Sequence, residues 1–309
     1  MAARAAEPIP PPGAARASTT ESASAKINLT LHVLGRRSDS YHRLESLVVF
    51  ADVADALTAT VTDGPVELTV TGRFAGELQS GTPAGENLIL RAARALADRR
   101  PDRVPVGAHL VLTKRLPIGA GLGGGSADGA AALRLLNRLW GLDLPIAELA
   151  AIGIALGADV PVCLHSRPAA MAGIGEDVKP VPGMPALPML LVHPGVSVPT
   201  GDVFGRLPPA ERRGLPPLPS RFASVTDVVD WLKTTRNDLT EPAITLAPPI
   251  GAALDMLAAD HECRLARMSG SGTSVFGIFL SPEAASRAAA RLHSARPHWW
   301  FATTLTGGS

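Results

Sequence analysis

A glycine-rich stretch, LPIGAGLGGGSADGAAAL, occupies residues 116–133, and glycine fills every position from Gly119 to Gly125 except two. Backbone N–H groups that no Cβ atom shields can surround an anion, and the first turn of a following helix adds about half a positive charge. A tight connection between a strand and a helix would need only one or two glycines. The stretch therefore favours a phosphate-binding loop over a simple turn.

Three common phosphate-binding loops do not fit this stretch. A Walker A loop has lysine before its serine or threonine, whereas Gly125 precedes Ser126 here. The dinucleotide pattern G-x-G-x-x-G is matched, but no strand–helix–strand unit opens the chain, and the acid about 20 residues further on, Asp143, falls in a turn. The protein-kinase loop connects two strands, while this one opens a helix. An NAD-dependent oxidoreductase stays open as a distant alternative.

A lysine and a carboxylate outside the glycine stretch could supply acid–base chemistry. Lys26 and Asn28 fall on the polar face of an alternating strand that begins at Ala25, so both point the same way. Asp159 lies in the segment GADVP after an expected helix. Spacing alone leaves two other interpretations open: Lys26 as one exposed charge on a strand, and Asp159 as the end of a helix near Gly157.

Hydrophobic periodicity outlines the elements that must position these residues. Several strands precede the first helix, which is not the strict alternation of a doubly wound sheet, so we predict an α+β fold. A strand precedes the glycine stretch and a helix follows it. The expected strands lie at residues 25–33, 44–53, 57–61, 66–70 and 107–113, and the expected helices begin near residues 88, 127, 146 and 282. In a further segment, Asp238 and Glu241 predict a capping box.

The length of 309 residues predicts two domains of about 150 residues each. We expect a disordered N-terminal tail over residues 1–21, because alanine, proline and small polar residues dominate it. An organellar transit peptide is the alternative, but the proline run resists the amphipathic helix that such peptides use. The first domain then covers residues 22–175 and the second residues 176–309, because glycine and proline become dense between residues 170 and 185.

Composition narrows the class of protein. The net charge is +1 and the arginines are scattered among acids, which argues against a nucleic-acid partner. No apolar run approaches the roughly 18 to 20 residues that a membrane span needs. Cys163 and Cys263 lie far apart without metal-ligand spacing, which is typical of reduced thiols. We therefore expect a cytoplasmic protein without a nucleic-acid or membrane partner. A monomer or homodimer is expected, although composition does not decide between them.

The glycine stretch resembles the central motif of the GHMP small-molecule kinases, Pro-x-x-x-Gly-Leu-Gly, which stands here as Pro117, Gly121, Leu122 and Gly123. Two further segments, SAKINLTLHVLGRRSDSYHRLES and RMSGSGTSVFGIF, resemble the N-terminal motif and the C-terminal glycine motif of that superfamily. LGADVPVCL and HPGVSVPT agree as well. The resemblance is specific because these motifs follow one another in the right order over residues 24–279.

The resemblance implies a two-domain GHMP kinase fold, with an N-terminal domain like domain 2 of ribosomal protein S5 and a ferredoxin-like C-terminal domain. It implies transfer of the γ-phosphoryl group of ATP to the C2 hydroxyl of a methylerythritol unit linked to cytidine diphosphate, in the non-mevalonate route to isoprenoid precursors. Phosphoryl transfer needs in-line positioning, neutralisation of charge and an acceptor for the hydroxyl proton. We therefore expect Mg²⁺ as well as ATP.

The resemblance also assigns roles to individual residues. Lys26 and Asp159 match the catalytic cation and base. Tyr41 matches a ring that stacks on cytosine, His42 a hydrogen-bonding partner of the base, and Phe204 the ring on its other side. The matched ATP-binding residues are Asn87, Pro117, Gly119, Ala120, Gly121, Leu122, Gly123, Gly124, Gly125, Ser126 and Ala127, and the matched acceptor-binding residues are Asn28, Tyr41, His42, Thr200 and Phe204. The resemblance assigns no metal ligand.

Other interpretations of these residues stay open. Asn87 could cap the helix that follows it, Tyr41 could be a turn residue, and Phe204 could belong to an ordinary core. The family usually has glycine where Ser40 stands, and serine would strain a turn with positive φ. The motifs also fit a GHMP kinase with a mevalonate-like or homoserine-like acceptor, or a nucleotide-binding module without turnover.

Overall fold

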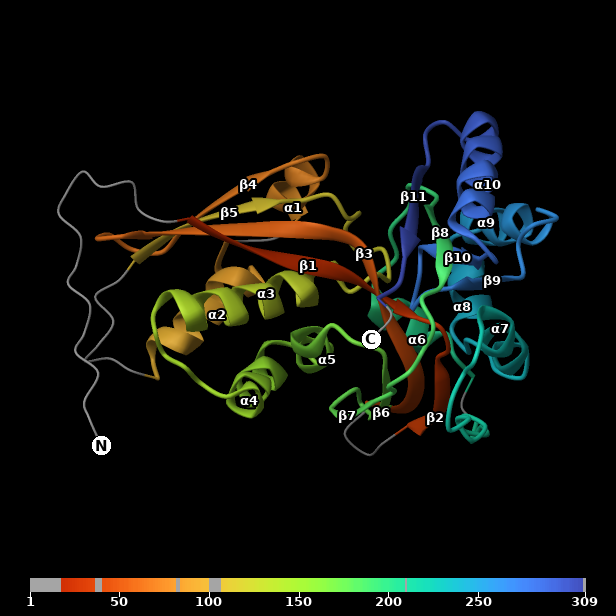
Figure 1. Cartoon of the computed structure of the whole chain (residues 1–309), viewed down its shortest axis with the longest axis horizontal. Coiled ribbons are helices and arrows are strands. Elements are labelled where there is room, and N and C mark those ends of the chain that lie inside the picture. The colour runs from red at the N-terminus through yellow and green to blue at the C-terminus, as the bar shows by residue number, and fades with distance from the viewer. Residues whose placement is uncertain (1–17, 37–40, 82–83, 100–106, 209, 308–309) are drawn as a thin grey trace.

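The computed structural model describes residues 18–36, 41–81, 84–99, 107–208 and 210–307 (Figure 1). The expected tail over residues 1–21 lies outside these ranges except for its last four residues, which correct the expectation. They open strand β1 (Ser18–Asn28), where Ser18 pairs with Thr60 of another strand. β-branched threonines at this point suit a pleated strand, and composition alone did not weigh that preference.

Within the described ranges, seven strands form one sheet around a long central strand, β3 (His42–Thr62). The sheet order is β4-β5-β3-β6-β7, and β1 and β2 also pair with β3. β3 joins the strands expected at residues 44–53 and 57–61, because Ala54 to Ala56 pair with β1 beyond a register shift that separates Ala54 from Phe50. The other members are β2 (His32–Arg36), β4 (Glu67–Thr71), β5 (Gly107–Thr113), β6 (Ala169–Gly173) and β7 (Asp177–Pro180).

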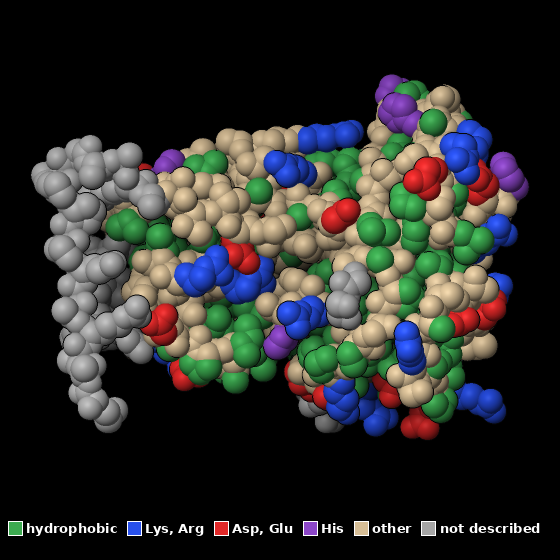
Figure 2. Space-filling model, in the orientation of Figure 1, with side chains coloured by type: hydrophobic (Ala, Val, Ile, Leu, Met, Phe, Trp, Pro, Cys, Tyr) green, Lys and Arg blue, Asp and Glu red, His purple; other side chains and the backbone are tan. Residues whose placement is uncertain are grey.

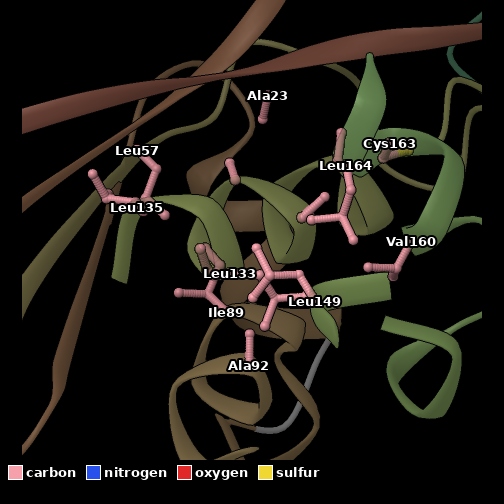
Figure 3. Close-up of a cluster of buried hydrophobic side chains, with 14 of the residues drawn as sticks. Ala23, Leu57, Ile89, Ala92, Leu133, Leu135, Leu149, Val160, Cys163 and Leu164 are labelled. Atoms are coloured by element: carbon pink, nitrogen blue, oxygen red, sulfur yellow. The ribbon is translucent and has the colours of Figure 1, made fainter. Parts of the chain in front are cut away.

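Helices cover one side of this sheet (Figure 1). They are α2 (Leu88–Ala97), α3 (Gly124–Leu139), α4 (Ile146–Leu156) and α5 (Val160–His165), and the expected helix starts near residues 88 and 146 are confirmed. Figure 3 shows the core that they share: Leu57 of β3 lies beside Leu135, and Ile89, Leu133 and Leu149 group together. The short helices α1 (Ala75–Gly81) and η1 (Ala84–Glu86) precede α2.

A second, antiparallel sheet has the order β11-β8-β10-β9. Together with α10 between β10 and β11, this order is typical of a ferredoxin-like domain. Ser281 caps α10 by accepting a hydrogen bond from the Ala284 N–H, as expected. The elements are β8 (Pro188–His193), α6 (Thr200–Gly205), α7 (Val225–Lys233), α8 (Thr240–Leu246), α9 (Pro249–Ala258), β9 (Leu265–Met268), β10 (Val275–Ile278), α10 (Pro282–Ala295) and β11 (Trp300–Leu305).

The expected domain boundary after residue 175 falls inside a hairpin of the large sheet. β7 pairs with β6, so the first sheet continues to Pro180. Gly173 and Gly175 have positive φ angles of 76° and 119° because they form the turn of this hairpin and not a linker. The second sheet begins at Pro188, so the connection between the two sheets lies between residues 180 and 188.

Candidate active site

A cleft of about 870 Å³ is lined by the glycine stretch, by the end of β1 and by segments 197–201 and 270–271 of the C-terminal half. Every described residue that the sequence assigned to catalysis, ATP or the acceptor borders it, except Leu122 and Ala127. The side chains of those two residues face away from the cleft. Leu122 turns into one core and Ala127 into the other, because an apolar side chain beside a polar cleft gains from burial.

The glycine stretch leaves β5 and opens α3 in a conformation that only glycine adopts easily. Gly119, Gly121 and Gly123 have φ angles of 63°, 72° and 63°. A Cβ atom on Gly121 would lie 2.4 Å from the carbonyl oxygen of Ser269, and the Ser269 hydroxyl donates to the Gly121 carbonyl at 2.8 Å. The central and C-terminal glycine motifs, distant in sequence, therefore meet at the cleft.

Lys26 and Asp159 form an ion pair at this cleft. Lys26 Nζ lies 2.8 Å from Asp159 Oδ2, and the side chains are 5% and 38% exposed. A Cβ atom on Gly123 would lie 3.1 Å from Lys26 Cβ, so the lysine stem packs against the glycine loop. Burial excludes the interpretation of Lys26 as an exposed surface charge. α4 ends at Leu156, and Asp159 stands at the start of α5, so it does not end the preceding helix.

The acceptor end of the cleft brings two predicted rings together in an unexpected pair. The rings of His42 and Phe204 stack with centroids 5.0 Å apart and planes at 26°. Burial, with the nearby charges of Arg36 and Arg212, lowers the pKa of His42. The Tyr41 ring, expected opposite Phe204, is 61% exposed. Ser40, whose effect on this turn was in question, lies outside the described residues.

Thr200 and Asn28 place polar groups near the same end. The Thr200 hydroxyl lies 2.9 Å from the Ser271 hydroxyl. Asn28 is buried, and its Nδ2 donates to the Ser46 hydroxyl at 2.7 Å. Asn28 Oδ1 is buried without a hydrogen-bond partner among the described residues. A buried acceptor of this kind costs free energy unless a ligand satisfies it.

Asn87 caps the helix that follows it, which was the alternative to ATP binding, and it also borders the cleft. Its Oδ1 accepts a hydrogen bond from the Ile89 N–H at 2.9 Å, which caps the N-terminus of α2. The same residue lines the cleft near the start of α3. Capping and contact with ATP are therefore compatible roles for this side chain.

Sequence reasoning missed a buried charged cluster of Lys114, Asp55 and Asp128 beside the phosphate loop. Lys114 Nζ lies 2.5 Å from Asp55 Oδ2 and 2.7 Å from Asp128 Oδ2. Asp55 Oδ1 accepts from the N–H groups of Arg115 and Leu116, which lead into the loop. Only four of the 29 Lys and Arg residues are lysines, so each lysine stands out in the sequence. That scarcity is the signal that could have drawn attention to Lys114.

Burial shapes the charges of this cluster. Burial raises the pKa of Asp128 to about 7, although the ammonium of Lys114 acts in the opposite direction. The pKa of Lys114 is also raised: burial opposes its charge, but the attraction of Asp128 and Asp55 outweighs that cost. Lys114 and Asp128 both border the cleft. The cluster therefore lies next to the phosphate-binding loop and supports it.

The described residues contain no group of three or more His, Cys, Asp or Glu side chains that could hold a metal ion. None of their helices is long and apolar enough to cross a membrane. On the face shown in Figure 2, Lys and Arg side chains are interspersed with Asp and Glu side chains.

Comparisons with known proteins agree with the motifs. The model of the GHMP kinases N terminal domain matches residues 87–167, and that of the GHMP kinases C terminal matches residues 227–298. The chain is 48% identical over 291 residues to the 4-diphosphocytidyl-2-C-methyl-D-erythritol kinase of Parvibaculum lavamentivorans, covering 94% of this chain and 98% of that protein. The chain is 51% identical over 289 residues to the protein of the same name from Methylobacterium radiotolerans, covering 92% of this chain and 97% of that protein.

Solved structures give the same result for the fold. The crystal structure of a 4-(cytidine 5'-diphospho)-2C-methyl-D-erythritol kinase superposes with a TM-score of 0.73 at 34% identity, covering 94% of this chain and 100% of that chain. A homoserine kinase from Cytophaga hutchinsonii, 19% identical with a TM-score of 0.68, shares the fold alone and covers 94% and 95%. The two-domain GHMP kinase fold is thus confirmed, and the chain belongs to the 4-diphosphocytidyl-2-C-methyl-D-erythritol kinase family of the GHMP kinases.

Proposed function

We propose that this ATP-dependent small-molecule kinase phosphorylates the C2 hydroxyl of 4-diphosphocytidyl-2-C-methyl-D-erythritol, a step of the non-mevalonate route to isoprenoid precursors. The names of its relatives support this acceptor. The observation that carries the proposal is the 2.8 Å contact between Lys26 Nζ and Asp159 Oδ2 at the wall of the cleft. Phosphoryl transfer to an alcohol needs such a base beside a phosphate-binding loop.

Asp159 acts as the acceptor for the hydroxyl proton. Its side chain is partly exposed to the cleft, where an alcohol can reach it, while Lys26 is buried against the loop. The ammonium of Lys26 donates a charge-assisted hydrogen bond to Asp159 Oδ2 at 2.8 Å, which holds the carboxylate in place. It also lies where it can polarise the attacking hydroxyl. A positioned base of this kind contributes roughly 10²- to 10⁴-fold to turnover.

The glycine stretch and the first turn of α3 bind the phosphates of ATP. Free backbone N–H groups and the helix N-terminus both favour anions. Mg²⁺ fits this site, since it usually keeps several waters and uses one or two carboxylates together with substrate phosphates, and so needs no cage of protein ligands. Among the oxygen donors that line the cleft, Ser126 and Asp159 would hold it. Bound there, Mg²⁺ would neutralise the charge on the transferred phosphoryl group.

The acceptor lies at the end of the cleft with the aromatic rings. Phe204 and Tyr41 offer faces for the cytosine ring, and base–aromatic stacking is worth about 1 to 3 kcal/mol per base. A cytosine between these rings would displace His42 from its present stack on Phe204 and leave it free to hydrogen-bond the base. The unsatisfied Asn28 Oδ1 suits a hydroxyl of the sugar alcohol. Thr200, beside Ser271, completes this end.

We place the enzyme in the cytoplasm as a monomer or homodimer, with small molecules as its partners. Reduced thiols fit that compartment. Burial raises the pKa of Cys163 to about 12 and that of Cys263 to about 11, which keeps both thiols protonated and unreactive. Neither a nucleic acid nor a membrane is part of the proposal.

One coupled assay of ADP release tests the reaction. ATP, Mg²⁺ and the cytidine diphosphate alcohol should give ADP and a product with one added phosphoryl group, which ³¹P NMR should place on C2. Mevalonate and homoserine serve as competing acceptors, and Lys26→Ala as the inactive control. Faster turnover of mevalonate or homoserine would assign another GHMP kinase activity. ATP binding without ADP from any acceptor would indicate a nucleotide-binding module.

A further inference from the structure

Helix α3 lies between β1 and α5, the two elements that hold the catalytic pair (Figure 1). Arg134, near the C-terminal end of α3, has a mostly buried side chain. Its Nε donates to Glu21 Oε1 at 2.6 Å, and its Nη2 donates to the Ser22 carbonyl at 3.0 Å. Both partners belong to β1, five and four residues before Lys26 along the strand.

The remaining nitrogen of the same guanidinium holds α5. Arg134 Nη1 donates to the carbonyl oxygens of Cys163 at 2.7 Å and Leu164 at 3.2 Å. These carbonyls belong to the last turn of α5, where backbone oxygens have no partner within the helix and where a cation is favoured. Asp159 stands at the other end of this six-residue helix. A shift of α5 would therefore move Asp159 directly.

We propose that Arg134 is a positioning residue that sets the distance between Lys26 and Asp159 by fastening β1 and α5 to the helix that opens at the phosphate loop. This inference rests on the proposed function, in which Lys26 and Asp159 are the catalytic pair. Arg134 does not line the cleft and touches neither of them. It acts only through the elements that carry them.

The placement of Asp159 depends on such support. At the start of α5 its side chain makes no capping hydrogen bond to the described backbone, so among the described residues Lys26 is its hydrogen-bond partner and α5 is its anchor. A misplacement of about 1 Å at a reacting group can cost roughly 10²-fold in rate. Arginine is suited to this task because its planar fork donates in several fixed directions at once, whereas the ammonium of lysine is a compact point charge.

The chain offers a matched control in Arg138, one turn further along α3. The guanidinium of Arg138 forms an ion pair with Oε2 of the same carboxylate, Glu21. Its side chain is 53% exposed, against 16% for Arg134, and Glu21 is the partner that the structure gives it. Removing Arg138 weakens the charge pairing of Glu21 but leaves the bonds to α5 in place.

The experiment compares Arg134→Ala and Arg138→Ala in the full-length enzyme and in an Asp159→Asn background. We expect Arg134→Ala to lower kcat by about 10- to 100-fold, with the KM values for ATP and for the acceptor within about threefold of wild type. Arg138→Ala should keep kcat within about twofold. In the Asp159→Asn background, Arg134→Ala should cause little further loss, because the base that it positions is already gone.

Arg134→Lys covers the case in which the alanine variant fails to fold. It keeps the charge and most of the stem but not the three-way fork, so kcat should fall by about 3- to 10-fold with unchanged KM values. A folded Arg134 variant with normal kcat, beside an impaired Asp159→Asn, would overturn the inference alone. So would an equal fold-loss with and without Asp159. Normal kcat in Asp159→Asn would contradict the proposed pair and the inference with it.

Discussion

Lys114 is the cation of a buried cluster that contains two carboxylates, and its removal should destabilise the protein strongly. The side chains of Lys114, Asp55 and Asp128 are 3%, 0% and 6% exposed. Lys114→Met keeps much of the volume but leaves both carboxylates without their counter-ion. Breaking a buried ion pair by removing one partner costs about 3 to 5 kcal/mol. We expect a loss of that size in the free energy of unfolding.

The assay is urea-induced unfolding at pH 7.5, followed by circular dichroism, with the loss taken from the shift of the midpoint and the m-value. The matched control is Asp128→Asn, which keeps the shape of the cluster and leaves one lysine with one carboxylate. We expect this control to lower the free energy of unfolding by no more than about 1 kcal/mol, and it can raise it, because the substitution also removes a buried charge. A Lys114→Met variant within about 1 kcal/mol of wild type would refute the reasoning.

The pH dependence of the control follows from the raised pKa of Asp128. Burial raises that pKa to about 7 from its ordinary value of 3.8, so the folded state holds a proton that the unfolded state releases at lower pH. Stability then falls as pH rises between about 4 and 7, since the folded state binds more protons. Asp128→Asn lacks this group. The free energy of unfolding of Asp128→Asn, relative to that of wild type, should therefore increase as pH rises from about 4 to 7.

Two further predictions concern the ends of the cleft. Gly123→Val should weaken ATP binding and lower kcat, because the φ angle of Gly123 is 63° and the new Cβ atom would lie 3.1 Å from the stem of Lys26. Gly125→Ala is the control. It should change ATP binding and kcat little, since no described atom lies within 4 Å of its Cβ position. Equal ATP affinities of the two variants, measured by calorimetry, would count against the loop assignment. Phe204→Ala should raise the KM of the cytidine diphosphate acceptor by about 5- to 100-fold and leave that of ATP nearly unchanged, as expected from the loss of one stacking partner. A larger effect on ATP would put the cytosine elsewhere.

Much of the fold could be predicted because local signals agreed with the tertiary structure. The expected helix at residues 146–156 matches α4, and the helix after Ser281 matches α10 with its cap. Local signals failed where tertiary contacts decide. Asp238 and Glu241 predicted a capping box, which is wrong: α8 begins at Thr240, and Asp238 Oδ2 instead accepts from the Val33 N–H at 2.8 Å.

The candidate site was predictable where a motif fixes the backbone and unpredictable where distant elements meet. The glycine loop could be recognised because glycine is needed for positive φ and for contact with anions. The stack of His42 on Phe204 joins β3 to α6, and no spacing in the sequence indicates it. The contacts of Lys114 likewise join β3, the end of β5 and α3.

The most direct test of the account is the turnover of Asp159→Asn, with binding constants for ATP and the acceptor and a check that the variant is folded. Asparagine keeps nearly the same shape but cannot accept the hydroxyl proton as a carboxylate does. We predict that kcat falls by roughly 10²- to 10⁴-fold while both ligands still bind, and that Lys26→Ala adds little to this loss. Near-normal turnover in a folded Asp159→Asn would contradict the account and leave the loop, Mg²⁺ and Lys26 to support the reaction without a base.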